Sequence, residues 1–373
     1  MSGAAAAKSV VAIKFDPFED VRQFFVGALA KLGVTLPDTQ DVHLVSVEYF
    51  HQLRRRIPAR PRQVLWSKEL NARALATDEQ QAVERIAGEL ERGEDVTPRL
   101  STSIRMSVAD TLKNGSYDGL LTDWGVHHLH IASNVRPDGF VVRGRALLFA
   151  FISGDTAHLL DLGGHGTSSF ASQDLFDIIH DNWPDEIASW RAPGVVPGSL
   201  SPKLRDPKHR RLLRGKFTFG VEARDGTVYL PPGGGVVTSG HSTEAVDQAN
   251  ALLNVVRPAE VWMREHAAWA REQIAIRTGR EFDELHLQFC AAPTLASGRP
   301  TVCEVQTDIF FRPVPPHGAG TPSIGRRVRA DATSLATGIS LLGHFGNGHL
   351  GMVTGSSPRV GGGVGPAAPG PPK

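Results

Sequence analysis

The chain has 373 residues, of which 41% are hydrophobic and 21% charged, and its formal net charge is +1. This length exceeds what one average domain needs, and the balanced charge excludes a global basic field, so any contact with nucleic acid must come from local patches. Two cysteines form neither a disulfide framework nor a CxxC metal site, no apolar run is long enough to cross a membrane, and residues 1–7 lack a signal-peptide pattern. We therefore expect a cytoplasmic protein without a membrane partner.

The first hundred residues predict mainly helices. Asp16 is a good N-cap and Pro17 suits the first helical position, and the apolar spacing that follows predicts a helix as far as Gly33. Residues 42–48, Val-His-Leu-Val-Ser-Val-Glu, predict a strand. A second helix with an apolar stripe is expected to end at Gly93. Nothing in this part indicates catalysis.

Two basic runs are candidates for binding RNA phosphates. The first covers residues 54–62 and offers Arg54, Arg55 and Arg56, unless it is a solvated loop kept open by its two prolines. The second covers residues 203–216 and offers Lys203, Arg210 and Arg211, unless these form the polar side of a short helix.

The stretch Trp124 to Ile131, Trp-Gly-Val-His-His-Leu-His-Ile, holds three of the chain's fifteen histidines. In a strand, the period of two places His128 and His130 on one face and His127 on the other, with Leu129 and Ile131. Two imidazoles on one open face suit general acid–base chemistry or metal ligation. The alternative is a half-buried strand whose histidines only satisfy backbone groups.

Two further strands complete a predicted meander. Gly144–Ile152 and Thr156–Leu162 have strand composition, and a Ser-Gly-Asp turn separates them. The third strand ends at Gly163-Gly164-His165-Gly166, where glycines permit tight geometry and leave His165 free to project.

Residues 115–182 resemble the sheet of the RelE/ParE/HigB-like toxins. The resemblance lies in an aromatic that opens a strand, a second strand rich in Leu and Phe, a short acidic turn, and a third strand reading His-Leu-Leu-Asp-Leu-Gly-Gly. It implies a compact sheet that cleaves mRNA without a required metal. The chain departs from the family after the third strand, where His165 and Thr167-Ser168-Ser169 replace basic residues, and in its long flanking regions.

These features together predict a metal-independent endoribonuclease. Its candidate residues are His128 and His130 as acid and base, His165 as a third participant, Arg143 or Arg145 as phosphate clamp, and Trp124 to stack a base. One alternative is a zinc-dependent hydrolase with the three histidines as ligands. Another is a non-catalytic module that binds RNA or a protein partner.

The expected fold class is α+β, with a small antiparallel meander sheet, flanking helices and a second α+β domain. In that second domain Asp225-Gly226 predicts a hairpin and Pro258 is expected to break a helix. The expected regions are a mainly helical part at 1–110, the histidine domain at 111–192, a basic linker at 193–216, the second domain at 217–314 and a disordered tail at 315–373.

Overall fold

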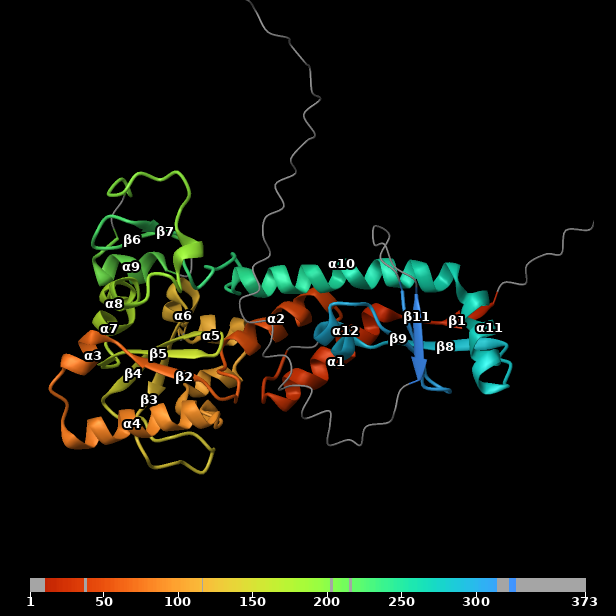
Figure 1. The fold of residues 1–373 in the computed structure, drawn as a ribbon, viewed down its shortest axis with the longest axis horizontal. Coiled ribbons are helices and arrows are strands. Elements are labelled where there is room, and N and C mark those ends of the chain that lie inside the picture. The colour runs from red at the N-terminus through yellow and green to blue at the C-terminus, as the bar shows by residue number, and fades with distance from the viewer. Residues whose placement is uncertain are drawn as a thin grey trace, which may run out of the picture.

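The structure is a computed structural model that describes residues 11–36, 39–115, 117–201, 204–214, 217–313 and 322–326. Its helices and mixed sheets form an α+β protein, which confirms the predicted fold class. Figure 1 shows two lobes side by side. The terminal lobe contains residues 11–54 and 243–326, and the central lobe contains residues 55–242.

Both ends of the chain build the terminal lobe. Its sheet has the order β1-β8-β9-β10-β11, in which β1 pairs in parallel with β8 and the later strands pair antiparallel. The segments 1–110 and 217–314, treated as separate regions above, therefore contribute to one hydrophobic core. Its elements are β1 (Ala12–Lys14), α1 (Pro17–Lys31), α2 (Val42–Arg54), α10 (Thr243–Glu265), α11 (Ala267–Thr278), β8 (Glu284–Phe289), α12 (Ala291–Ser297), β9 (Val302–Glu304), β10 (Ile309–Arg312) and β11 (Ser323–Arg326).

Helix α2 occupies the stretch where a strand was predicted over residues 42–48, and that prediction is wrong. The Asp41 side chain accepts hydrogen bonds from the N–H groups of His43 and Leu44 and so begins the helix. Residues 45–52 are all buried because α2 packs against both α1 and α10. A helix buried on most sides has no clear apolar stripe, so its sequence does not show the helical period.

Helix α10 continues through Pro258, where a break was predicted. Val256, Ala259 and Met263 lie buried in the terminal core on both sides of the proline. Their burial offsets the backbone hydrogen bond that proline cannot donate. The helix ends instead at Glu265, and α11 begins after His266.

The predicted meander is the centre of the central lobe. Strands β3 (Val126–His130), β4 (Leu147–Ser153) and β5 (Thr156–Gly163) pair antiparallel in chain order, as expected. Strand β2 (Gln63–Trp66), which the sequence analysis did not identify, adds a parallel neighbour to β5. The other elements are α3 (Lys68–Ala72), α4 (Thr77–Arg92), α5 (Val108–Lys113), α6 (Gly119–Trp124), α7 (Thr167–Ala171), α8 (Asp174–Asn182), α9 (Pro207–Leu213), β6 (Val221–Glu222), β7 (Val228–Tyr229) and three short 3-10 turns at Thr97–Arg99, Thr102–Arg105 and Ala188–Trp190.

Both faces of this sheet are covered. Leu129 and Leu148 pack with α4 on one face, whereas Val126 and Phe149 pack with α6 and α8 on the other. The alternation predicted for the histidine strand is thus correct. The open face expected for His128 and His130 is wrong, because α6, α7 and α8 cover it.

Three further predictions concern the linker, the hairpin and the tail. The predicted linker contains α9, and the predicted Asp225-Gly226 hairpin is present as β6 and β7. Within the predicted tail, β11 pairs with β10, and residues 315–321 and 327–373 lie outside the described residues. No helix in the described part of the chain is long and apolar enough to span a membrane.

Candidate functional site

The structure brings His128, His130 and His165 together. His130 and Gly163 both pair with Leu147 of the middle strand, so the turn after β5 returns His165 to the end of β3. Ring centroids lie 6.5 Å apart for His128 and His130, and 5.3 Å apart for His130 and His165. Phe170 of α7 packs edge-on to His128 at 5.0 Å. We call these three histidines and Phe170 the histidine cluster.

The cluster passes from buried to exposed. His130 is 3% exposed, the His128 side chain is 13% exposed, and His165 lies at the surface. Burial lowers the pKa of His130 to about 4 and also lowers the pKa of His128, and the positive charge of Arg143 lowers both further. Both pKa shifts favour the neutral form of the two buried rings.

His165 has a defined tautomer. Its Nε2 lies 3.1 Å from the carbonyl oxygen of Gly144. A carbonyl only accepts hydrogen bonds, so Nε2 carries the proton and Nδ1 of the neutral ring is left as the acceptor. Arg143 and Arg145 flank Gly144, and both are exposed. The two predicted phosphate clamps therefore lie in the loop that contacts the exposed histidine.

Sequence reasoning missed Asp118. Its Oδ2 lies 3.5 Å from Nδ1 of His128, and its side chain also accepts from the N–H of Leu121 at the start of α6. The sequence does contain a signal for this residue: Asp118 has the position of an N-cap, and Gly125 that of a C-cap, of a short helix between them. Asp118 and His128 line a pocket with room for about one water molecule. This pocket is too small for a nucleotide.

Trp124 cannot stack a base, contrary to the prediction. It is 1% exposed and packs from the end of α6 into the core, against Phe176 of α8. The guanidinium carbons of Arg210 and Arg214 lie 5.1 and 4.8 Å from its ring centroid. These cation–π contacts belong to the interior of the central lobe.

The first basic run also serves the fold, which corrects its assignment to RNA binding. Arg54 forms an ion pair with Glu244 of α10. Arg55 is 5% exposed and Arg56 donates to the carbonyl oxygen of Leu32 at 3.0 Å. Arg54 also donates to the carbonyl oxygen of Gly233, so the contacts of Arg54 and Arg56 connect the two lobes, whereas Arg55 bonds within the central lobe. Few N–H groups of these arginines are left for a phosphate.

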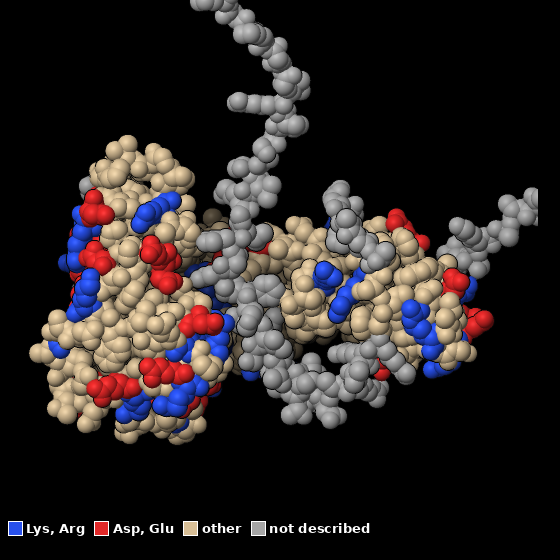
Figure 2. Space-filling view, in the orientation of Figure 1, with Lys and Arg blue, Asp and Glu red and all other residues tan. Residues whose placement is uncertain are grey.

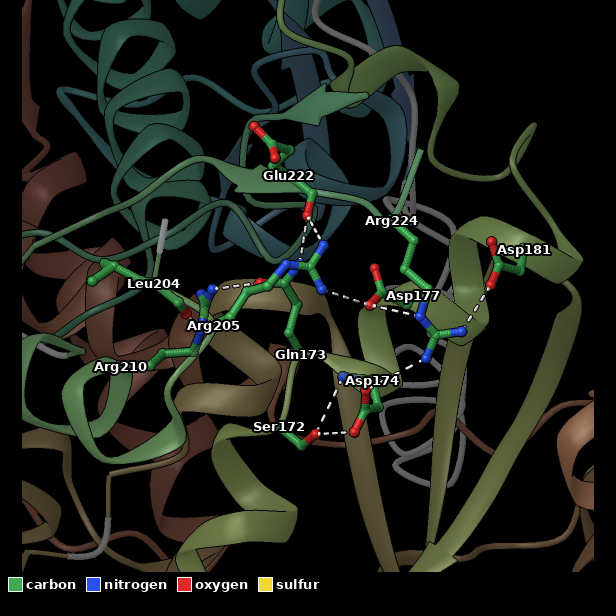
Figure 3. A network of polar contacts seen from close by, with 10 residues as sticks. All are labelled: Ser172, Gln173, Asp174, Asp177, Asp181, Leu204, Arg205, Arg210, Glu222 and Arg224. Carbon is green, nitrogen blue, oxygen red and sulfur yellow. Dashed lines mark hydrogen bonds and ion pairs between the residues drawn. The ribbon is translucent and has the colours of Figure 1, made fainter. Parts of the chain in front are cut away.

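The described arginines of the second basic run differ in exposure. Arg210 is 2% exposed and donates to Gln173 Oε1 at 3.1 Å, within the polar network of Figure 3. Its assignment to RNA binding is therefore corrected as well. Arg211 is exposed on α9, whereas Lys203 lies outside the described residues. On the face drawn in Figure 2, basic and acidic side chains are intermixed and form no continuous basic stripe.

The geometry of the cluster gives the zinc alternative no support. Among the described residues, no group of three or more His, Cys, Asp or Glu is placed to hold a metal ion. The planes of His130 and His165 lie 29° apart, so the two rings stack. Ligand lone pairs for tetrahedral zinc must converge, whereas those of stacked rings lie in nearly parallel planes.

Comparison with protein-family models, with curated proteins and with solved structures finds no match to this chain. The resemblance to RelE/ParE/HigB-like toxins therefore stays a prediction.

Proposed function

We propose that this protein is a metal-independent endoribonuclease that acts at the exposed edge of the histidine cluster. The observation that carries the proposal is His165, an exposed imidazole whose Nε2 proton is directed to the Gly144 carbonyl. Its Nδ1 is thereby kept as a proton acceptor in the neutral ring. The proposed location is the cytoplasm, where RNA is abundant.

The proposed reaction is cleavage by the RNA's own 2′-hydroxyl. His165 Nδ1 takes the 2′-hydroxyl proton while the 2′-oxygen attacks phosphorus. The bond from phosphorus to the 5′-oxygen then breaks and leaves a 2′,3′-cyclic phosphate. The departing 5′-oxygen takes a proton from water, and the resulting hydroxide takes the proton from His165 Nδ1. Arg143, whose positive charge acts on the cluster, stabilises the charge on the phosphorane, and Arg145 lies in the same loop.

His128 and His130 have a supporting role in this proposal, in place of the acid and base roles expected from the sequence. Both are neutral, and His130 stacks directly on His165. Phe170 packs edge-on to His128, and the Asp118 carboxylate lies 3.5 Å from Nδ1 of that ring. The buried histidines thus hold the reactive ring in place without transferring protons at neutral pH.

The decisive experiment measures cleavage of a single-stranded RNA oligonucleotide in the presence of chelator. His165→Ala should lower the rate by roughly 10²- to 10⁴-fold, the usual contribution of a general base. His209→Ala removes an exposed histidine of α9 and should leave the rate unchanged. Wild-type protein that cleaves no RNA, or a fully active His165→Ala variant, would contradict the proposal. Activity lost in chelator and restored by zinc would favour the hydrolase alternative.

A further inference from the structure

A second cluster of reactive side chains lies where the two lobes meet. Ser239 Oγ is 2.8 Å from Nδ1 of His241, and Nε2 of His241 is 3.0 Å from Oε2 of Glu48. Glu48 belongs to α2, whereas the other two residues precede α10. Ser239 is exposed, while His241 and Glu48 are buried. The three groups therefore form a spatial row, in which the hydroxyl lies at the surface, the imidazole beneath it and the carboxylate deepest.

The hydrogen bonds around Glu48 fix the direction of this arrangement. Its carboxylate also receives the side-chain amide of Gln52 at 2.7 Å and the backbone N–H of Val108 at 3.2 Å. A carboxylate surrounded by donors acts as the acceptor, so Nε2 of His241 donates to it. The neutral ring then presents Nδ1 as an acceptor, and the Ser239 hydroxyl donates to it.

The turn that carries Ser239 is held firmly. Val237 N–H donates to the His241 carbonyl at 3.0 Å, and Gly240 N–H donates to the Val237 carbonyl at 2.8 Å. Gly240 has a φ of +82°, and a Cβ at this position would lie 2.7 Å from Cδ1 of Leu112. Backbone geometry and packing against α5 therefore keep the hydroxyl beside the imidazole.

We infer that Ser239, His241 and Glu48 form a nucleophilic site for small activated esters. Ser239 Oγ attacks the ester carbonyl carbon while His241 Nδ1 takes the hydroxyl proton, and the leaving alcohol departs with that proton. Water then releases the acyl group from the serine by the same proton transfers. In this site Nδ1 faces the serine and Nε2 the carboxylate, the reverse of the common serine-hydrolase arrangement.

Gly240, between Ser239 and His241 in the chain, lines a small pocket, whereas those two residues do not. This pocket, also lined by Val108, Thr111 and Leu121, has room for about one water-sized group. An acetyl ester is therefore the appropriate probe. This inference is independent of the endoribonuclease proposal, because Ser239, His241 and Glu48 take no part in the proposed cleavage of RNA.

The first test uses the full chain carrying His165→Ala, since an exposed imidazole can itself hydrolyse activated esters. With p-nitrophenyl acetate, mass spectrometry should locate one acetyl group on Ser239. Adding Ser239→Ala should remove this acetylation and slow nitrophenolate release by about tenfold or more. Thr238→Ala changes the neighbouring exposed hydroxyl and should have no effect. Acetylation elsewhere, or equal rates with Ser239→Ala, would overturn the inference.

The second test measures activation by the imidazole without disturbing the buried Glu48. Ser239→Cys places a thiol beside His241, and Thr238→Cys places one on the same exposed turn. The thiolate is the form of cysteine that reacts with iodoacetamide. At pH 7 the Ser239→Cys variant should therefore be alkylated about tenfold faster than the Thr238→Cys variant. Equal rates and equal pH profiles would show that Ser239 is an ordinary turn residue and would overturn the inference.

Discussion

At the scale of single residues, strand alternation was the most informative signal. It assigned His127 to the face with Leu129, and His128 and His130 to the opposite face, as the structure has them. It could not show how far each face is covered. Burial depends on helices that reach the sheet from elsewhere in the chain, and no local pattern records them. The role of His165 also required the Gly144 contact, which a sequence cannot display.

Burial of His127 should make stability depend on pH. Burial lowers its pKa from 6.5 to about 4, so the unfolded chain binds a proton more readily between these values. The stabilisation by neutral His127 is complete above pH 6.5 and is lost as the pH falls towards 4, by about 3 kcal/mol. His127→Gln should reduce this pH dependence in urea denaturation, whereas His209→Gln, at an exposed position, should retain it. An unchanged dependence in His127→Gln would mean that another group causes the acid instability.

At the scale of elements, clear local signals predicted well. Asp16 caps α1 as expected, and the apolar stripe of α4 is buried up to Gly93 in its left-handed conformation. The failures have a common cause, which is tertiary burial. Helix α2 is buried too completely to show its period, and α10 tolerates Pro258 because both sides of it pack into the core.

A buried ion pair fixes helix α4 to the end of β3. Arg99 donates to both carboxylate oxygens of Glu89 at 2.5 and 2.6 Å and to the carbonyl oxygen of His130 at 3.2 Å. Arg99→Met leaves a carboxylate largely unpaired in the interior, so the free energy of unfolding should fall by about 3 to 5 kcal/mol.

The matched control for this change is Arg92→Met. Arg92 is the last residue of α4 and forms an ion pair with Glu94, just beyond the helix. Both side chains of this pair are more than half exposed. This control should cost less than about 1 kcal/mol. Equal losses for the two variants in urea denaturation would show that the Arg99 pair adds no more than a surface contact.

At the scale of the whole molecule, the division into lobes was beyond sequence reasoning. Among the described residues, the terminal core is drawn from 11–50 and from residue 245 onward, whereas both central cores are drawn from 57–229. The pairing of β1 with β8 joins the two ends across the entire central lobe. No local sequence pattern reveals a pairing between strands so far apart in the chain. The regions expected from composition were therefore continuous segments in chain order.

This division predicts how fragments of the chain fold. Residues 55–242 hold all members of both central cores and should unfold cooperatively when heated, as followed by circular dichroism. Residues 243–326 alone lack β1, α1 and α2, so the buried face of α10 around Val256 should be exposed and bind a hydrophobic dye. Adding a peptide of residues 11–54 should suppress dye binding, whereas a scrambled peptide should not. Cooperative folding of 243–326 alone, with no response to the peptide, would mean that the two ends are not one folding unit.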